Sequence, residues 1–504
     1  MLNVVNSPMT KRAAGILMPI TSLPSPFGIG DFGTEARNFA DFLYRSGQHY
    51  WQLLPLTPIA KEQGFSPYSA ASSMAGNIWL ISPELLAREG LIKEDDLLFA
   101  RVRATDQVDY QNALLAKTQI FKTAYHNFHS QKQEPFEAFC HREAYWLDDF
   151  ALYMALKEQF DNKPWHQWPD PYKHRELKKL MTFTEEHQAG MRETKWLQFI
   201  FFHQLNGLRR YCHDLNIELI GDLPFYISHD SVDVWSNPEL FALNEDGSMA
   251  GVAGVPPDYF NENGQLWGMP VYCWDVLKEQ RYRWWLKRIR KNLEMTDVLR
   301  LDHFRAFSEY WEVPSTAKTA VHGQWKSGPG ASFFTILKEE FGSLPFIAED
   351  LGDISPSVYS LRDQFRLPGM KVLQFATGNN MPQSDHIPHN FEKNFIVYTG
   401  THDNNTTRGW FRKELTNKDR KQLENYTGTA VTDKNIHKVL SRMAYASVAR
   451  TAILPLQDVL GLDEKTRMNT PASTEKNWMW RLLPEQLTPQ EEQQLKEWTV
   501  LYAR

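Results

Sequence analysis

The sequence contains few cysteines and no long apolar run. Its 504 residues include three cysteines, Cys140, Cys212 and Cys273, which are far apart and odd in number. That distribution argues against a disulfide framework and agrees with a reducing compartment. No apolar stretch approaches the roughly 20 residues of a membrane span, and residues 1–14 lack the apolar core of a signal peptide. We therefore expect a cytoplasmic protein.

A strong excess of one charge is also missing. The 55 basic and 61 acidic residues give a net charge of -6, and no dense Lys/Arg tract is present. This balance predicts neither nucleic acid nor an anionic membrane as a partner. The richest basic stretch, Arg281 to Lys291, includes Trp284, Trp285 and Ile289. That mixture is typical of an amphipathic helix, so we expect its charges on a solvated face.

Metal-binding patterns are incomplete. Asn244-x-Asp246-Gly247 faintly resembles a calcium loop, but Ala242 and Ala253 stand where such a loop needs carboxylates. Cysteine and histidine spacings of zinc sites do not occur. We expect no metal ion.

Aromatic residues, in contrast, are abundant. They make up 13% of the chain and include 17 tryptophans. Many must be ordinary core residues. Sugars, however, pack their C–H faces on flat rings while their hydroxyls take hydrogen bonds, so aromatic side chains on loops suit a carbohydrate groove.

Three short apolar runs end in acidic residues. In the first, alternation predicts a strand with Leu299 and Leu301 on one face and Arg300 and Asp302 on the other. In a parallel barrel that second face is the lumen, and a carboxylate at the C-terminal end of a strand lies where barrels place their chemistry. The alternative is that Asp302 caps the next helix or pairs with Arg300 structurally. The three runs are Val298–Phe304, Phe346–Asp350 and Phe395–Asp403.

Glycosyl transfer requires such a set of groups: a nucleophile, a proton donor and a partner for an oxocarbenium-like transition state. The order Arg-x-Asp-His, Ala-Glu-Asp, His-Asp resembles the short motifs of the α-amylase clan. Other stretches are similar to the amylomaltases, or 4-α-glucanotransferases, of glycoside hydrolase family 77. The resemblance runs from about residue 15 to 481 and is carried by Ser66–Tyr68, Gly254–Phe260, Gly264–Gly268 and Arg467–Asn469.

The resemblance implies roles for the acids. Asp302 is the expected nucleophile, because Arg300 on its face keeps a carboxylate ionised. Glu349 matches the family position of the acid/base, with Asp350 as its competitor in sequence. Asp403 is expected to hold the 2- and 3-hydroxyls of the distorted sugar.

Further residues are implied to bind substrate. Tyr68 is an equally good candidate for a buried tyrosine that closes an insertion on the barrel. Residues 258–260 are expected over the acceptor sites, or else as a packed Ω-loop, and Asp222 is expected to support the site structurally. The expected binding residues are Arg300, His303, His402, Tyr68, Ser66, Asp258, Tyr259, Phe260, Gln265, Trp267 and Asn469.

The expected fold is a (β/α)8 TIM barrel, in which eight strands alternate with helical stretches. A mainly helical insertion is expected over 58–191, after the second strand. A loop-rich insertion is expected over 227–273, after the third, with mouth loops at 315–332 and 377–390. The predicted strands are 15–20, 49–56, 218–222, 298–302, 346–349, 370–375, 395–400 and 452–456.

The first loop contains a misleading motif. Gly28-x-Gly30-x-x-Gly33 matches the dinucleotide-binding fingerprint, but Pro24 and Pro26 separate it from the preceding strand. The next strand also ends in Leu-Pro-Leu and not in an acid. We expect a loop at the barrel mouth and no cofactor.

The expected function is transfer of an α-1,4-glucan segment from a maltooligosaccharide or starch-like donor to the 4-hydroxyl of glucose or another glucan. A covalent glycosyl-aspartate is the expected intermediate. Two alternatives remain: an α-amylase-type hydrolase and a catalytically inactive glucan-binding protein. The acids alone do not separate transfer from hydrolysis, so that distinction depends on the resemblance. The sequence predicts no oligomeric state.

Overall fold

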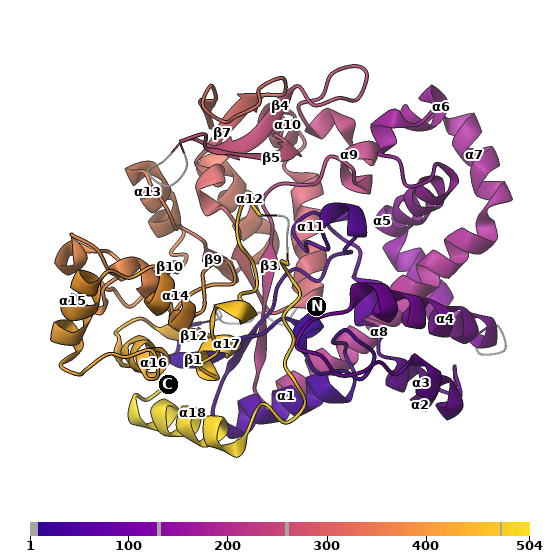
Figure 1. Cartoon of the computed structure of the whole chain (residues 1–504). Helices are drawn as coiled ribbons and strands as arrows, with labels where there is room; N and C mark the ends of the chain where they lie inside the picture. Colours follow the sequence, from indigo (N-terminus) through magenta and orange to yellow (C-terminus); the bar gives the residue numbers. More distant parts are fainter. Residues whose placement is uncertain (1–8, 129–132, 258–261, 474–475) are drawn as a thin grey trace.

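The structure is a computed structural model that describes residues 9–128, 133–257, 262–473 and 476–504 (Figure 1). At its centre, eight parallel strands form one sheet in the order β10-β11-β12-β1-β2-β3-β6-β9. The prediction of a (β/α)8 barrel is confirmed. The strands are β1 (Ala13–Leu17), β2 (Tyr50–Gln52), β3 (Glu218–Leu223), β6 (Val298–Leu301), β9 (Phe346–Ala348), β10 (Gly369–Val372), β11 (Phe395–Tyr398) and β12 (Thr451–Pro455).

The barrel closes between β9 and β10 through few contacts. Ala348 N donates to Pro368 O at 2.9 Å. Asp350, just after β9, bridges the same seam, because its carboxylate accepts from Met370 N at 2.8 Å and from Arg362. Asp350 is therefore buried, and its carboxylate binds Arg362 and Met370 N at the seam.

Alternation within the strands separates two apolar layers. Val298 of β6 joins the cluster that fills the barrel, with Tyr50, Ile220 and Ile347 among its members. Leu299 and Leu301 belong instead to the larger cluster between the strands and the surrounding helices. The predicted faces of this strand are therefore correct.

Several strands are shorter than predicted, β2 and β10 among them. β2 ends at Gln52 because the chain leaves the sheet toward Pro55, and β10 gives way at Leu373 to a 3-10 turn. All of residues 373–394 are described, and only 3-10 turns, without an α-helix, connect β10 to β11. None of the described helices has the length and apolarity that a membrane crossing requires.

Helices surround the barrel in Figure 1. They follow the strands in the usual alternation, since a crossover between parallel strands needs a helix-sized connection. These helices are α1 (Thr34–Arg45), α8 (Gln188–Asp214), α11 (Arg283–Met295), α12 (Gly330–Phe341), α13 (Pro356–Gln364), α14 (Thr407–Lys413), α15 (Asn417–Thr427), α16 (Ile436–Ala446), α17 (Leu456–Val459) and α18 (Pro489–Leu501).

The connection from β2 to β3 is helical in the described residues. Its aromatic side chains pack across α5 and α8, with Phe136 and Phe139 of α5 against Phe199 of α8. Before α8 it contains α2 (Pro83–Arg88), α3 (Glu94–Ala100), α4 (Tyr110–Phe128), α5 (Glu134–Gln159), α6 (Asp170–Lys173) and α7 (Leu177–Glu186).

Three strands from the regions expected to be loops, 227–273 and 315–332, form a second sheet together with residues 309–314. Its antiparallel order is β5-β4-β7-β8, and it lies at the top of Figure 1. The strands are short, and β4 pairs with β7 some sixty positions later, so a local sequence pattern could not reveal them. The strands are β4 (Gly251–Val255), β5 (Gln265–Pro270), β7 (Glu309–Pro314) and β8 (Gln324–Ser327). Two short helices, α9 (Val232–Ser236) and α10 (Trp274–Glu279), precede and follow the first two strands along the chain.

The basic helix α11 meets the expectation in part: Arg283, Lys287 and Arg290 are exposed, but two other charges are buried. Arg288 and Lys291 are each 1% exposed and not solvated as predicted. Lys291 pairs with the buried Glu143 of α5 at 2.7 Å, and Arg288 donates to the carbonyl oxygen of Phe225 at 3.2 Å. Lys291 thus joins the barrel to its helical insertion, and Arg288 binds the chain that follows β3.

The glycine-rich loop after β1 is packed against backbone. A Cβ atom at Gly30 would lie 1.8 Å from the carbonyl oxygen of Ile20, so only glycine fits there. Gly33 N donates to the Asp31 carboxylate at 3.0 Å. The glycines thus have a structural explanation within the loop.

Candidate active site

A cleft of about 860 Å³ opens at the C-terminal ends of the barrel strands. The second sheet contributes β5 to its wall, and the segment after β2 contributes another wall. Eleven of the predicted site residues line it: Ser66, Tyr68, Gln265, Trp267, Arg300, Asp302, His303, Glu349, His402, Asp403 and, from the chain after β12, Asn469. Asp258, Tyr259 and Phe260 lie outside the described residues.

Arg300 is the electrostatic centre of the cleft floor. Its Nη1 donates to both carboxylate oxygens of Asp222 at 2.8 Å and to Asp302 Oδ1 at 3.0 Å. Its Nη2 lies 4.0 Å from Glu349 Oε2. The Asp222 side chain has no exposed surface, whereas Asp302 and Glu349 are 29% and 15% exposed. Asp222 therefore orients Arg300, and the other two acids face the cleft.

The backbone after β6 fixes Glu349. His303 adopts a left-handed conformation (φ 49°), which turns the chain so that its N–H donates to Glu349 Oε2 at 2.8 Å. Phe304 N donates to the Glu349 carbonyl oxygen at 3.1 Å. A strained φ at a non-glycine residue is typical of functional sites. The position of Glu349 thus depends on the turn that follows Asp302.

Burial changes the protonation of both acids. It raises the pKa of Asp302 to about 7 and the pKa of Glu349 to about 8. Arg300 opposes the shift in each case and lies closer to Asp302, which favours ionisation of Asp302 first. The pair can therefore hold one proton near neutral pH, with Glu349 as its carrier.

Asp403 projects from the loop after β11. Its Oδ1 accepts from Asn469 Nδ2 at 2.6 Å, and its Oδ2 lies 3.4 Å from His402 Nε2. Arg467 Nη2 donates to the Asp403 carbonyl oxygen at 2.7 Å, and Arg467 Nε donates to the Asn469 carbonyl oxygen at 2.7 Å. The segment after β12 therefore holds both the backbone and the side chain of Asp403.

Tyr68 joins the insertion to the barrel floor. Its hydroxyl donates to Asp222 Oδ2 at 2.7 Å and lies 2.8 Å from His402 Nε2, and its ring stacks on His402 at 5.4 Å. Ser66 Oγ accepts from Tyr68 N at 3.2 Å. The Tyr68 hydroxyl is thus bound to the barrel, as the structural interpretation expects, and the residue also lines the cleft, so its role in substrate binding stays a prediction.

Aromatic rings form the wall opposite Tyr68. Trp267 of β5 meets His303 edge-on at 4.8 Å between ring centroids, and its Nε1 donates to Gln265 Oε1 at 3.3 Å. Burial lowers the pKa of His303 to about 3, so this imidazole is neutral at physiological pH. Tyr226, which the sequence did not suggest, packs against Trp267 at 5.8 Å.

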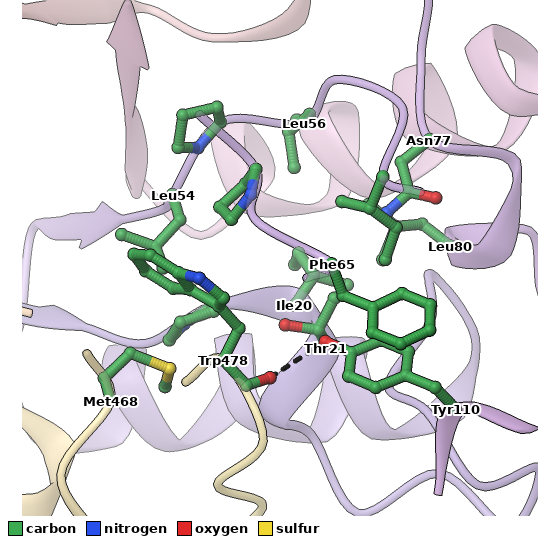
Figure 2. A pocket seen from close by; sticks show the side chains of 14 residues that line it. Ile20, Thr21, Leu54, Leu56, Phe65, Asn77, Leu80, Tyr110, Met468 and Trp478 are labelled. Atoms are coloured by element: carbon green, nitrogen blue, oxygen red, sulfur yellow. Dashed lines mark hydrogen bonds between the residues drawn. The ribbon is translucent and has the colours of Figure 1, made fainter. Parts of the chain in front are cut away.

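Trp478 is a second cleft residue that sequence reasoning missed. Its ring lies 5.5 Å from that of Tyr68, and its backbone has a positive φ of 63°. Figure 2 shows it between Leu54, Met468 and Tyr110, whose hydroxyl donates to the Trp478 carbonyl oxygen at 2.8 Å. A small cavity of about 30 Å³ lies beside it. No local signal marks this residue, because its neighbours come from distant segments.

Acids gather in the cleft without forming a metal site. Among the described ranges, no group of three or more His, Cys, Asp or Glu side chains is arranged to hold a metal ion. The carboxylates are instead matched by Arg300, Asn469 and backbone N–H groups.

Known proteins are similar to this chain over nearly its whole length. The glycoside hydrolase family 77 model, described as 4-alpha-glucanotransferase, matches residues 18–487. A 4-alpha-glucanotransferase of Synechocystis is 44% identical over 98% of this chain and 99% of its own. One from Aquifex aeolicus is 45% identical over 94% and 95%, respectively. The amylomaltase from Streptococcus agalactiae, solved in complex with acarbose, superposes with a TM-score of 0.94 at 40% identity and covers 98% of this chain and 100% of its own. The chain therefore belongs to the 4-alpha-glucanotransferases of glycoside hydrolase family 77.

Proposed function

We propose that the enzyme transfers α-1,4-glucan segments between maltooligosaccharides, with glucose as an acceptor, by a retaining double displacement. The observation that carries this proposal is the grouping of Asp302, Glu349 and Asp403, from the ends of three different strands, around one cleft. Retaining transfer needs two carboxyls about 5–5.5 Å apart that flank one anomeric carbon. The shared contact with Arg300 supports such a pairing for the first two acids.

Asp302 acts as the nucleophile in this mechanism. Its hydrogen bond to Arg300 stabilises the carboxylate, which attacks the anomeric carbon and forms a covalent glycosyl ester. Glu349 donates its proton to the departing glycosidic oxygen. As a carboxylate, it then removes a proton from the incoming 4-hydroxyl, and the attacking oxygen displaces Asp302. The raised pKa of Glu349 supports its starting role as an acid.

Asp403 serves the transition state. Held by Asn469 and Arg467, its free oxygen would accept hydrogen bonds from the 2- and 3-hydroxyls as the sugar flattens. His402 and His303 would lie beside the same sugar ring. Each neutral imidazole carries one hydrogen-bond donor and one acceptor. Tyr68 stacks on His402 and would support the sugar from the same side.

Transfer requires that an acceptor glucan intercept the intermediate before water does. Trp267 and Gln265 of β5, which line the cleft, are the proposed acceptor contacts. Asp258, Tyr259 and Phe260 lie outside the described residues, and their acceptor role stays a prediction from the sequence. Rings that orient an acceptor and limit attack by water favour this outcome. The amylomaltase that binds acarbose supports glucan binding in the same cleft.

The free cysteines support a cytoplasmic location.

Maltotriose tests the proposed reaction. A transferase should disproportionate it, so that two maltotrioses give glucose and maltopentaose or maltose and maltotetraose, followed by longer oligomers, without a rise in total reducing ends. A hydrolase would release glucose and maltose with a matching rise in reducing ends, and a binding protein would leave the oligomer distribution unchanged. Chromatography combined with a reducing-end assay separates these outcomes, and either of the last two would refute the proposal.

The pH dependence of kcat/KM should be bell-shaped. Activity requires ionised Asp302 and protonated Glu349, whose pKa values are raised to about 7 and about 8. Activity should fall below the lower value, as Asp302 takes up a proton, and above the higher value, as Glu349 loses one. The two steps belong to the pair because the groups interact. A profile that keeps rising above pH 9 would contradict these roles.

A further inference from the structure

The loop that carries Asp403 is held at both ends by one buried carboxylate. Thr399 follows β11, and Thr407 begins α14. Asp458 of α17 accepts from Thr399 Oγ1 at 2.6 Å, from Thr407 Oγ1 at 2.6 Å and from Thr407 N at 2.7 Å. One side chain therefore closes the loop 399–407 at its base.

This carboxylate lies in an unusual environment. Asp458 is 1% exposed, and Thr399 and Thr407 have no exposed surface. In the described part of the chain, no cationic side chain lies within ion-pair distance of Asp458, so its partners are the threonine donors alone. Burying a carboxylate without a cation is costly unless hydrogen bonds compensate it. The three donors provide that compensation. We call Asp458, Thr399 and Thr407 together the clamp, because their hydrogen bonds hold the loop 399–407 at its base.

The other support of Asp403 begins at the same place. The chain runs from Asp458 through Gly461, whose N–H donates to the Asp458 carbonyl oxygen at 3.1 Å, to Arg467 and Asn469. Those two residues hold the backbone and carboxylate of Asp403. Asn469 N also donates to the His402 carbonyl oxygen at 3.1 Å. Residues 399–407, which contain Asp403, and residues 458–469, which hold it by hydrogen bonds, therefore meet at Asp458.

We propose that Asp458 is a positioning residue for the transferase reaction, which acts by fixing the loop 399–407 so that Asp403 reaches the transition state. This inference rests on the role proposed for Asp403. Asp458 lies outside the cleft lining, so we expect it to act through the loop and not by contact with the glucan. Its effect should therefore appear in kcat and not in ground-state binding.

Asp458→Asn tests the clamp with little change in volume. The amide keeps one acceptor oxygen. At the Oδ2 position this oxygen accepts the two hydroxyls but leaves the amide nitrogen against Thr407 N–H, and in the reverse orientation the nitrogen faces the two hydroxyl donors. We expect kcat for maltotriose transfer to fall about 10²-fold, the loss typical of a displaced catalytic group, with KM changed by no more than about twofold. Thr399→Val and Thr407→Val should each give part of this loss, and Thr399→Ser and Thr407→Ser should retain activity.

Asp297→Asn is the matched control. Asp297 is also a largely buried carboxylate with several donors, Arg209, His213 and Leu219 N, but it precedes β6 at the opposite end of the barrel. Its variant should lower the thermal midpoint and leave kcat unchanged. Equal kcat values for Asp458→Asn and Asp297→Asn would show that the clamp serves stability alone, which would overturn the inference.

A double variant separates this inference from the proposed function. If Asp458 acts through Asp403, then Asp458→Asn combined with Asp403→Asn should be no slower than Asp403→Asn alone. If the losses in kcat of the two single variants multiply in the double variant, the positioning role is overturned while the role of Asp403 stays intact. Full activity of Asp403→Asn would instead refute the role of Asp403 itself, and with it the basis of the inference.

Discussion

Replacing Asp302 with asparagine should lower kcat for maltotriose transfer by about 10⁴-fold or more, the scale seen when a nucleophile is removed. The amide cannot form the glycosyl ester, and the residual groups of the cleft offer only orientation. Oligosaccharide binding should persist, because the rings and hydroxyl-binding groups on both walls remain in place. The loss should therefore fall on kcat and not on the dissociation constant.

Calorimetric titration with maltooligosaccharides, combined with single-turnover kinetics, measures both quantities. Asp353→Asn provides the control, since it removes an exposed carboxylate from the same end of the barrel without touching the cleft. It should behave like the unchanged enzyme. Activity of Asp302→Asn within tenfold of that control would mean that another group attacks the sugar.

Glu349→Gln should show a loss that depends on the leaving group. With maltotriose, kcat should fall by about 10²- to 10⁴-fold, the usual contribution of a general acid/base. With maltosyl fluoride as donor, the first step needs no proton, so the glycosyl-enzyme should still form. Azide, which attacks without a general base, should then restore turnover and give an α-maltosyl azide.

Asp350→Asn is the informative comparison for this prediction. Asp350 neighbours Glu349 in sequence but bonds Arg362 and Met370 N at the barrel seam. Its removal should reduce stability, and azide should have no effect on its activity. Rescue by azide in Asp350→Asn, or its absence in Glu349→Gln, would reverse the assignment of the acid/base.

The barrel strands and the acids at their ends could be predicted from the sequence, because the patterns that mark them are local. Strands β6, β9 and β11 are apolar runs that end in acid, and alternation alone assigns Val298 and Leu299 to opposite faces. Parallel strands then bring their C-terminal ends to one side, which gathers side chains that are a hundred residues apart. The resemblance to known motifs aided the strand assignment.

The remaining features depend on contacts that no local pattern records. The second sheet pairs β4 with β7, and the edge strand β8 is exposed throughout, so it shows no apolar alternation. Buried Lys291 is explained only by Glu143, which comes from the distant helix α5. Trp478 and Tyr226 enter the cleft because loops from separate parts of the chain meet there.

Trapping the covalent intermediate tests the central claim most directly. Glu349→Gln should be incubated with maltosyl fluoride, denatured, digested and examined by mass spectrometry. We predict a maltosyl adduct on the peptide that contains Asp302, at a stoichiometry near one per chain, which disappears when azide is added. An adduct on a peptide with Asp403 or Asp222, or the absence of any adduct despite release of fluoride, would contradict Asp302 as the nucleophile.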